Sequence, residues 1–467
     1  MLNMNRVNKG EVIVPTAEER DEYLAYNSAD IFFSNLENGI KALMVEELSE
    51  NSILICGAMT SFGKIWLLDF INEFYKKICQ KEKTTILLSE VTAEYRRYTG
   101  YYIKMPFICT PHLLAKEIIV TGLSIPVSEP MLLLRNEKEY IKESIENLEM
   151  RHPNLGNGYA IAWAYYAYKY ISVLLNRINP EKVILWNKYY AFHHIFQGIC
   201  LDWNIKVEYM EFGCLPGTIS IESSGQQGES LIASEFKKFR KEPIQPDDYI
   251  STKKILTYLK HSGLNRNFQS DKKFCNEMIK SYKIGRQTIV YFGQNDYESG
   301  LFPYTVRTKK YHSPSFKSTI EALEYLKLLS IKNEWNLIYK PHPIMHSLGL
   351  HSNVSKSSYL MTEIVNVNIN SLIDAAGVII TILSQSAYIA LIRGKPVVML
   401  GFTQLRGKKC TYEAFKKVNI ELCIRRALKY GLTKRQKSNF IKHCSQMLNF
   451  CLYDDLSDKE VKIGLNI

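Results

Sequence analysis

Residues 377–400 read GVIITILSQSAYIALIRGKPVVML, and this stretch decides the fold class. An apolar run from Gly377 to Ile382 is followed by a helical pattern from Ser386 to Arg393, and a second apolar run extends from Pro396 to Leu400. Two short apolar runs joined by one helix are typical of a β-α-β unit with parallel strands. The same pattern precedes this stretch, with strands predicted at 288–291 and 336–339 and a helix at 318–329. The second half of the chain is therefore predicted to be an α/β domain.

The first half repeats the alternation of short apolar runs and longer amphipathic segments. Strands are predicted at 53–56, 85–88, 131–134, 183–186 and 207–210, with a helix at 65–79. Between the halves, residues 235–286 are rich in Lys, Asp and Gln, which indicates a domain junction of helix and loop. The sequence thus predicts Rossmann-like domains at 1–240 and 287–430, a helical linker region at 241–286 and a C-terminal helix within 431–467.

Length and composition support two folded domains. A chain of 467 residues, with 46% hydrophobic and 23% charged residues, can bury two cores and is not a disordered protein. No apolar run is long enough for a signal peptide or a charge-free membrane span. Residues 159–175 come nearest, but Lys169 and several tyrosines favour a buried helix. The expected location is cytoplasmic, with peripheral attachment to the inner face of the membrane as a further option.

Cysteine spacing and net charge limit the kinds of partner and metal site that are expected. Ten cysteines are scattered without CxxC pairs or repeated Cys/His spacing, which argues against a metal site or a disulfide framework and for buried, reduced thiols. The net charge of +12 favours anionic partners such as nucleotide phosphates, acidic glycans or lipid headgroups. Because lysines are spread over many helices and no RNA-binding or DNA-reading motif is present, nucleic acid is not an expected partner.

Polar residues follow four of the predicted strands. Ligands of open parallel sheets bind beyond the carboxyl ends of the strands, so these positions are the candidate binding site. The residues, in chain order, are Glu211 and Gly213; Gly293, Gln294 and Asp296; Lys340 and His342; and Ser384, Gln385 and Ser386.

Each of these groups also has a plain structural interpretation. A lone Glu211 is more often a solvated loop residue, and Gly293 to Asp296 fits an ordinary turn capped by its own side chains. His342 favours function, because prolines on both sides stiffen the backbone that presents it. Ser384 and Ser386 suit a helix N-cap and a phosphate-binding turn equally.

Residues 57–65, GAMTSFGKI, suggest a phosphate loop but depart from it twice. Five residues separate the glycines where four are needed, and Ile65 stands where a Ser or Thr would bind Mg²⁺. The segment is predicted to be a strand-to-helix turn, and an ATPase is not favoured.

Taken together, the motifs resemble those of the bacterial capsule polysaccharide synthesis family, which includes the Kdo transferases, and more distantly those of bacterial sialyltransferases. Glu211-Phe212-Gly213, His342-Pro343 and Ser384-Gln385-Ser386 occur in the order of the family's acidic-acidic-Gly, His-Pro and Ser-Ser/Thr motifs. Residues 390–398, ALIRGKPVV, are similar to the family's EAL-x-GKPVV element, and 293–296 to its Gly-Gln-x-x-Asp strand end. Phe212 replaces the second acidic residue of the acidic-acidic-Gly motif. Ile389 stands where the EAL-x-GKPVV element has its glutamate.

This resemblance implies a GT-B fold, in which the two Rossmann-like domains face each other across a cleft. It implies a glycosyltransferase that moves an acidic sugar, of the Kdo or sialic-acid type, from a CMP-activated donor to a surface polysaccharide or glycolipid. The N-terminal domain would take the acceptor and the C-terminal domain the nucleotide sugar. No metal or other cofactor is implied, and an anionic membrane surface is a further expected contact.

The resemblance also implies roles for the candidate residues. Lys340 and His342 would neutralise the leaving phosphate, while Ser384 and Ser386 hold its oxygens. Glu211 would act as general base for inversion, or Asp296 as nucleophile or stabiliser for retention. The residues expected to complete donor binding are Gly213, Gly293, Gln294 and Gln385.

Two other interpretations stay open. A glycerophosphotransferase with a CDP-linked donor also pairs a His-Pro with a serine-rich element, but it requires an Asp-Tyr-Ser-Ser strand end, and Thr381 to Ser384 lacks the Asp. A non-catalytic sugar- or lipid-binding module of the same fold is suggested by Phe212 in the acidic motif.

Overall fold

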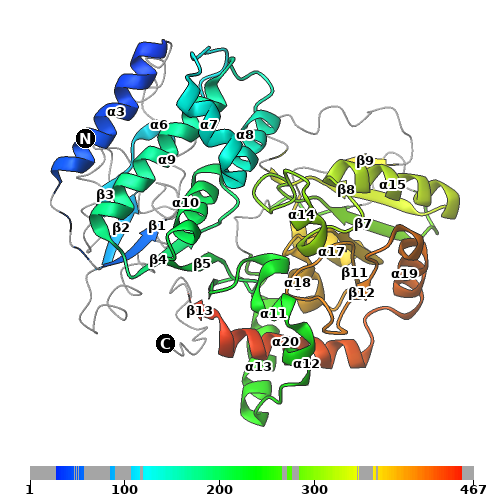
Figure 1. The fold of residues 1–467 in the computed structure, drawn as a ribbon. Helices are drawn as coiled ribbons and strands as arrows, with labels where there is room; N and C mark the ends of the chain where they lie inside the picture. The colour runs from blue at the N-terminus through cyan, green and yellow to red at the C-terminus, as the bar shows by residue number, and fades with distance from the viewer. Residues whose placement is uncertain are drawn as a thin grey trace. The chain divides into compact units, whose positions relative to one another are not determined.

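The computed structural model describes residues 28–46, 48, 50, 52–56, 85–89, 107–115, 119–265, 271–275, 283–343, 345, 361–363 and 367–454. These residues form two compact units, and the main boundary falls between Glu211 and Phe212. Figure 1 gives the element labels used below. The predicted helix at 65–79 and the phosphate-loop-like segment at 57–65 lie outside the described residues.

The first unit is built around a parallel sheet with the strand order β5-β4-β1-β2-β3. Its first strand along the chain lies centrally, with the next two on one side and the following two on the other, which is the order of a Rossmann sheet. Its elements are α3 (Ala29–Val45), β1 (Ile53–Cys56), β2 (Thr85–Ser89), β3 (Phe107–Cys109), α6 (His112–Ala115), α7 (Glu129–Glu137), α8 (Glu139–Arg151), α9 (Tyr159–Ile178), β4 (Lys182–Trp186), α10 (Ala191–Asp202) and β5 (Lys206–Phe212).

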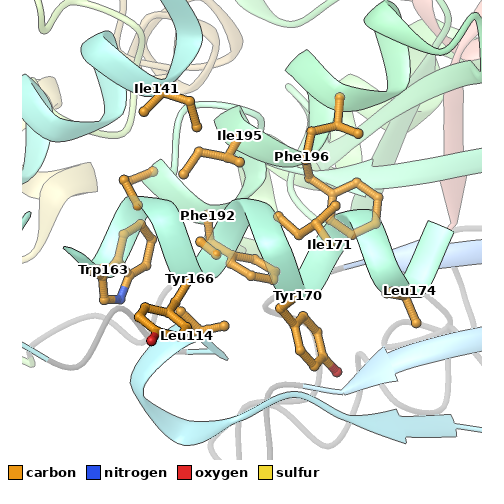
Figure 2. Packing of buried hydrophobic residues seen from close by; sticks show 14 of the residues in the cluster. Leu114, Ile141, Trp163, Tyr166, Tyr170, Ile171, Leu174, Phe192, Ile195 and Phe196 are labelled. Carbon is orange, nitrogen blue, oxygen red and sulfur yellow. The ribbon is translucent and has the colours of Figure 1, made fainter. Parts of the chain in front are cut away.

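Helix α9 is the centre of the first unit's core. It packs against α3, α8 and α10, and most of its residues are buried, as the sequence predicted for 159–175. Figure 2 shows Ile171 of this helix beside Phe192 and Phe196 of α10. The indole N–H of Trp163 donates to the backbone oxygen of Leu113 at 2.7 Å, so the one polar atom of this buried ring is satisfied.

The predicted strand at 131–134 is wrong, because these residues belong to α7. The apolar run Met-Leu-Leu-Leu is too short to distinguish strand from buried helix by its pattern. The residues before it decide: Pro130 stands in the first turn and Glu129 precedes it, both of which favour a helix start. The sequence also missed β3, whose three residues are too few to show a period.

The second unit contains a six-stranded sheet with the order β12-β11-β10-β7-β8-β9. All neighbouring strands are parallel, and the order again reverses beside the first strand, as in a Rossmann sheet. Its sheet elements and their helices are β7 (Thr288–Phe292), α14 (Val306–Tyr311), α15 (Thr319–Asn333), β8 (Asn336–Lys340), β9 (Met361–Glu363), α17 (Ile369–Ala375), β10 (Val378–Thr381), α18 (Ser386–Ile392), β11 (Val397–Met399), β12 (Tyr412–Glu413) and α19 (Lys417–Tyr430). Two Rossmann-like α/β domains are thereby confirmed, and their facing across a cleft stays a prediction.

Helices cover both faces of this second sheet. Alternate residues of β7 point to opposite faces, so that Ile289 and Tyr291 pack with α15 and α19, while Val290 and Phe292 pack with α17 and α18. Burial on both faces explains why the strands read as continuous apolar runs rather than as alternating patterns.

Residues 212–240, which the sequence placed in the first domain, lie in the second unit. Their elements and those at the end of the chain are β6 (Thr218–Glu222), the 3₁₀ turn η3 (Gln227–Glu229), α11 (Leu231–Ser234), α12 (Phe236–Lys241), α13 (Pro246–Ser262), α20 (Lys434–Phe450) and β13 (Leu452–Asp454). Strand β6 pairs antiparallel with β13, and the side chain of Gln446 donates to the backbone oxygen of Phe239. These long-range contacts tie the segment to the C-terminal half, and a sequence pattern does not report them.

Helix α20 packs against α13, within the segment predicted as a helical linker, and Figure 1 shows the two crossing. Among the cysteines whose surroundings are described, six of eight are buried. In the described part of the chain, no helix is long and apolar enough to cross a membrane.

Candidate functional site

The carboxyl ends of β7, β8 and β10 lie at one edge of the second sheet. Strand β7 is paired with β8 on one side and β10 on the other, and the chain leaves β7 toward β8 but leaves β10 toward β11. Ligands of doubly wound sheets bind at this reversal, because the two connections diverge and leave a crevice. The residues that follow β7 and β10 are therefore the structural candidates for a ligand site.

Two hydrogen bonds fix these strand ends to one another. The backbone N–H of Gly293 donates to the oxygen of Lys340 at 2.9 Å, and the side-chain oxygen of Gln294 accepts from the N–H of Leu383 at 2.7 Å. A Cβ at Gly293 would lie 2.9 Å from the hydroxyl of Tyr339, so a larger residue does not fit. The structure thus brings the ends of β7, β8 and β10 together, and Gln294 is a buried positioning residue.

The serine turn after β10 is held by its own hydroxyls. The hydroxyl of Ser386 donates to that of Ser384 at 2.9 Å, and the N–H of Ser386 donates to the same oxygen at 3.2 Å. The N–H of Ser384 donates in turn to the hydroxyl of Thr381. With two hydrogen bonds accepted, the half-buried Ser384 hydroxyl is left to act as a donor, which suits an anionic oxygen.

Gln385, the middle residue of this turn, is directed away from it. Its side-chain amide donates to the backbone oxygen of Phe212 at 3.1 Å, where the acidic motif of the sequence lies. Gln385 therefore connects two motifs that are 173 residues apart in the chain. This contact is structural, and a role of Gln385 in donor binding stays a prediction.

Asp296 is buried and serves the start of α15. Its two carboxylate oxygens accept from the N–H of Thr319 at 2.8 Å and from the Thr319 hydroxyl at 2.5 Å, and the residue is 1% exposed. Burial raises the pKa of this carboxyl to about 6, although the Thr319 hydrogen bonds oppose the rise. Asn295 caps the same turn through the N–H of Tyr297. Asp296 thus supports the turn and the start of α15, and its catalytic role stays a prediction.

Lys340 and His342 follow β8 at the same edge. Lys340 is the last residue of the strand, and burial lowers the pKa of its ammonium group. His342 is partly exposed and lies between a buried Pro341 and an exposed Pro343. His342 thus follows the strand end that is bonded to Gly293, and its role at the site stays a prediction.

Glu211 and Gly213 lie at the end of β5 and just beyond it. Glu211 is partly exposed and ends the first unit. The N–H of Gly213 donates to the oxygen of Thr218 at 2.8 Å, and a Cβ at Gly213 would come within 1.9 Å of the Thr218 hydroxyl. The turn into β6 therefore requires glycine at this position, and donor binding by Gly213 stays a prediction.

Sequence reasoning missed an ionic cluster near this edge, in which Glu229 and His312 are buried and Arg307 is exposed. Glu229 accepts from the guanidinium of Arg307 at 3.0 and 2.7 Å and lies 3.1 Å from Nε2 of His312. The N–H of Phe402, which follows β11, donates to the oxygen of His312 at 2.7 Å. Because Glu229 lies 78 residues before Arg307, no local pattern indicated the pair.

In the described ranges, no group of three or more His, Cys, Asp and Glu residues could hold a metal ion.

The site residues predicted from the sequence differ in their exposure. Lys340, His342 and Ser384 are partly accessible at one sheet edge, whereas Gln294 and Asp296 are buried supports.

Comparison with known proteins gives distant structural similarity. No family model and no curated protein matches the chain. Two Kdo transferases, the beta Kdo 2,4 and 2,7 transferases of Thermosulfurimonas dismutans KpsC, are 14% and 17% identical to it. The first has a TM-score of 0.41 and covers 58% of this chain and 80% of its own, and the second has a TM-score of 0.35 and covers 64% and 86%.

The UDP-GlcNAc 2-epimerase of Methanocaldococcus jannaschii, solved with UDP-GlcNAc and UDP, is 11% identical, with a TM-score of 0.36 over 85% of this chain and 98% of its own. The two Rossmann-like sheets described above are established by their own strand order and register.

Proposed function

We propose that this protein is a glycosyltransferase of the GT-B type that moves an acidic sugar, of the Kdo or sialic-acid kind, from a CMP-activated donor to a surface polysaccharide or glycolipid. The observation that supports this most is the arrangement of the strand ends where the strand order reverses between β7 and β10. There the Gln294–Leu383 hydrogen bond fixes the two strand ends, and the Ser384 hydroxyl is left as a donor. A preorganised donor of this kind stabilises charge on a departing phosphate without reorganisation.

In this proposal the leaving phosphate binds at the edge of the second sheet. Ser384 donates to one of its oxygens, and the cationic Lys340 and the imidazole of His342 offset its charge from the neighbouring strand end. As the bond between the sugar and CMP lengthens, the electron pair stays with the phosphate oxygen and positive charge grows on the sugar carbon. Stabilising the phosphate lowers the barrier to this step.

Removal of the acceptor proton is assigned to Glu211. Asp296 is a poor candidate for direct attack, because both of its oxygens accept from Thr319 and it is 1% exposed. A general base must reach the proton that it removes. The proposal therefore favours inversion at the sugar carbon.

A thermal-shift screen tests the donor. Purified protein is heated with CMP-Kdo, CMP-sialic acid, CDP-glycerol and UDP-GlcNAc in turn. A donor present at about a hundred times its Kd stabilises the folded state by about 2.7 kcal/mol, which raises the melting point of a unit of this size by several degrees. Release of CMP from the stabilising donor then separates an enzyme from a binding module.

The expected result is a shift with a CMP sugar that is lost in Ser384→Ala. Stabilisation by CDP-glycerol alone would favour the glycerophosphotransferase. Stabilisation without any release of CMP, in the presence of candidate acceptors, would favour the binding module.

A further inference from the structure

Helices α15 and α19 lie side by side over one face of the second sheet and are joined by a seam of polar contacts. Lys417 pairs with Glu321, and Lys332 pairs with Glu421, each at 2.8 Å. The hydroxyl of Tyr325 donates to the backbone oxygen of Lys417 at 3.0 Å. Because the earlier residues of one helix meet the earlier residues of the other, the two helices are parallel and present a common outer face.

Large aliphatic side chains stand on this outer face, on both sides of the seam. On α19, Val418 is 84% exposed and Leu422 is 57% exposed; on α15, Leu328 is 65% exposed and Ile331 is 48% exposed. Val418 and Leu422 are four residues apart and thus lie on one stripe of their helix. Single exposed aliphatic residues are ordinary, but four on two adjoining helices form an apolar patch that the described part of the chain leaves uncovered.

Cations surround this patch. The exposed basic residues on or next to α19 and its seam are Lys332, Lys416, Lys417, Arg425, Arg426 and Lys429. The carboxylates of the same face are fewer, and Glu321 and Glu421 are already paired with Lys417, Lys332 and Arg425. The face therefore combines aliphatic side chains with net positive charge.

We propose that the α15/α19 face docks on an anionic phospholipid membrane. Aliphatic side chains would enter the interface between headgroups and acyl chains, and the lysines and arginines around them would contact lipid phosphates. A second copy of this chain fits the face less well, because a two-fold contact would bring the same cations together. This inference specifies the membrane contact expected of the proposed glycosyltransferase, but it is independent of the donor chemistry.

Vesicle flotation of the full chain tests the proposal without any sugar donor. Vesicles of phosphatidylglycerol mixed with phosphatidylcholine are compared with vesicles of phosphatidylcholine alone. The double variant Val418→Asp/Leu422→Asp removes the apolar stripe, and Arg426→Gln/Lys429→Gln removes two cations. Matched controls on α13 are Ile250→Asp, where an exposed isoleucine is replaced, and Lys253→Gln/Lys254→Gln.

We expect binding to the anionic vesicles alone, with a steep fall as salt rises. Each cation removed should lower the partition coefficient about fivefold, and the Asp pair should lower it at least about tenfold, while the α13 variants bind as the unchanged chain does. Equal binding of the α19 and α13 variants, or no binding at low salt, would overturn the proposal. So would a change from dimer to monomer in the Asp variant, which would identify a second copy as the partner. Donor stabilisation in the thermal-shift screen is unaffected by either result, so the two proposals fail separately.

Discussion

Replacing Asp296 by Asn tests whether this carboxyl is a buried support of the fold. Asn keeps the shape of the side chain and can keep both contacts, since its oxygen accepts from the N–H of Thr319 and its amide donates to the Thr319 hydroxyl. The change therefore removes the ionisation and leaves the packing. We expect a folded protein whose stability responds differently to pH.

The expected size follows from the pKa. Burial raises the pKa of Asp296 from 3.8 to about 6 in the fold, so the folded protein binds more protons than the unfolded chain between these values. Stability then falls as pH rises through this window, because ionisation is easier in the unfolded chain. At about 1.4 kcal/mol per pKa unit, the loss relative to Asp296→Asn is about 3 kcal/mol, complete by about pH 7.

Urea unfolding at pH 4 to 8 measures this difference. Trp335 is the one tryptophan of the sequence between Phe212 and the C-terminus, so replacing the tryptophans before it by Phe lets fluorescence follow the second unit alone. The free energy of unfolding of the unchanged chain, minus that of the Asn variant, should fall by about 2 kcal/mol between pH 4 and 7, because the rest of the loss lies below pH 4, and should then stay level.

If this difference in the free energy of unfolding does not change with pH, or rises with pH, Asp296 is not the buried support that we infer. A rise would mean that the fold favours the carboxylate, as expected of a side chain beside cations in an open site. A loss of turnover by a thousandfold or so with an unchanged stability profile would restore the role of nucleophile.

Three further changes test the site and its supports. His342→Ala should lower turnover by about a hundredfold or more while the melting point stays close to that of the unchanged chain, and a variant that merely unfolds would make the histidine structural. Gln294→Leu removes the acceptor for the Leu383 N–H and leaves a buried donor unsatisfied, so we expect a loss of about 1–3 kcal/mol in stability and weaker donor binding, and full retention of both would exclude the positioning role. Burial lowers the pKa of Lys408 to about 8, so stability should rise as pH increases from about 8 toward 10.5, and Lys408→Met should abolish this rise in urea unfolding.

Much of the fold was predictable because buried parallel strands leave a clear trace in the sequence. Runs such as Thr288 to Tyr291 and Val183 to Trp186 are continuous and apolar, since both faces of each strand are covered, and both were confirmed as strands. The run Met131 to Leu134 has the same composition but belongs to a helix, and its flanking Glu129 and Pro130 distinguish it. Residues 212–240 could not be placed, because their contacts with the C-terminal half depend on tertiary structure alone.

The sequence predicted which strand ends lie together at the candidate site, but not which contacts each side chain makes there. The rule that ligands bind beyond parallel strand ends selected Gly293, Lys340 and Ser384, and the register of β7, β8 and β10 brings their segments to one edge. Sequence alone gave no sign that Gln294 would turn toward Leu383 or that Gln385 would reach Phe212. These contacts join residues that are far apart in the chain. A supporting side chain and a ligand-binding side chain also look alike in the sequence after a strand.

The division between buried supports and accessible groups has a physical reason. A donor such as the Ser384 hydroxyl stabilises developing charge only if its direction is set before the reaction, and neighbouring groups set it through hydrogen bonds. Gln294 contributes by accepting from the N–H of Leu383, and Thr381 contributes by accepting from the N–H of Ser384. A polar residue at a strand end can thus serve as a support or as a ligand group. Within the proposed function, Gln294→Leu should therefore lower kcat/KM for the CMP-sugar donor, although Gln294 acts only through the N–H of Leu383. Steady-state kinetics of CMP release measure this loss.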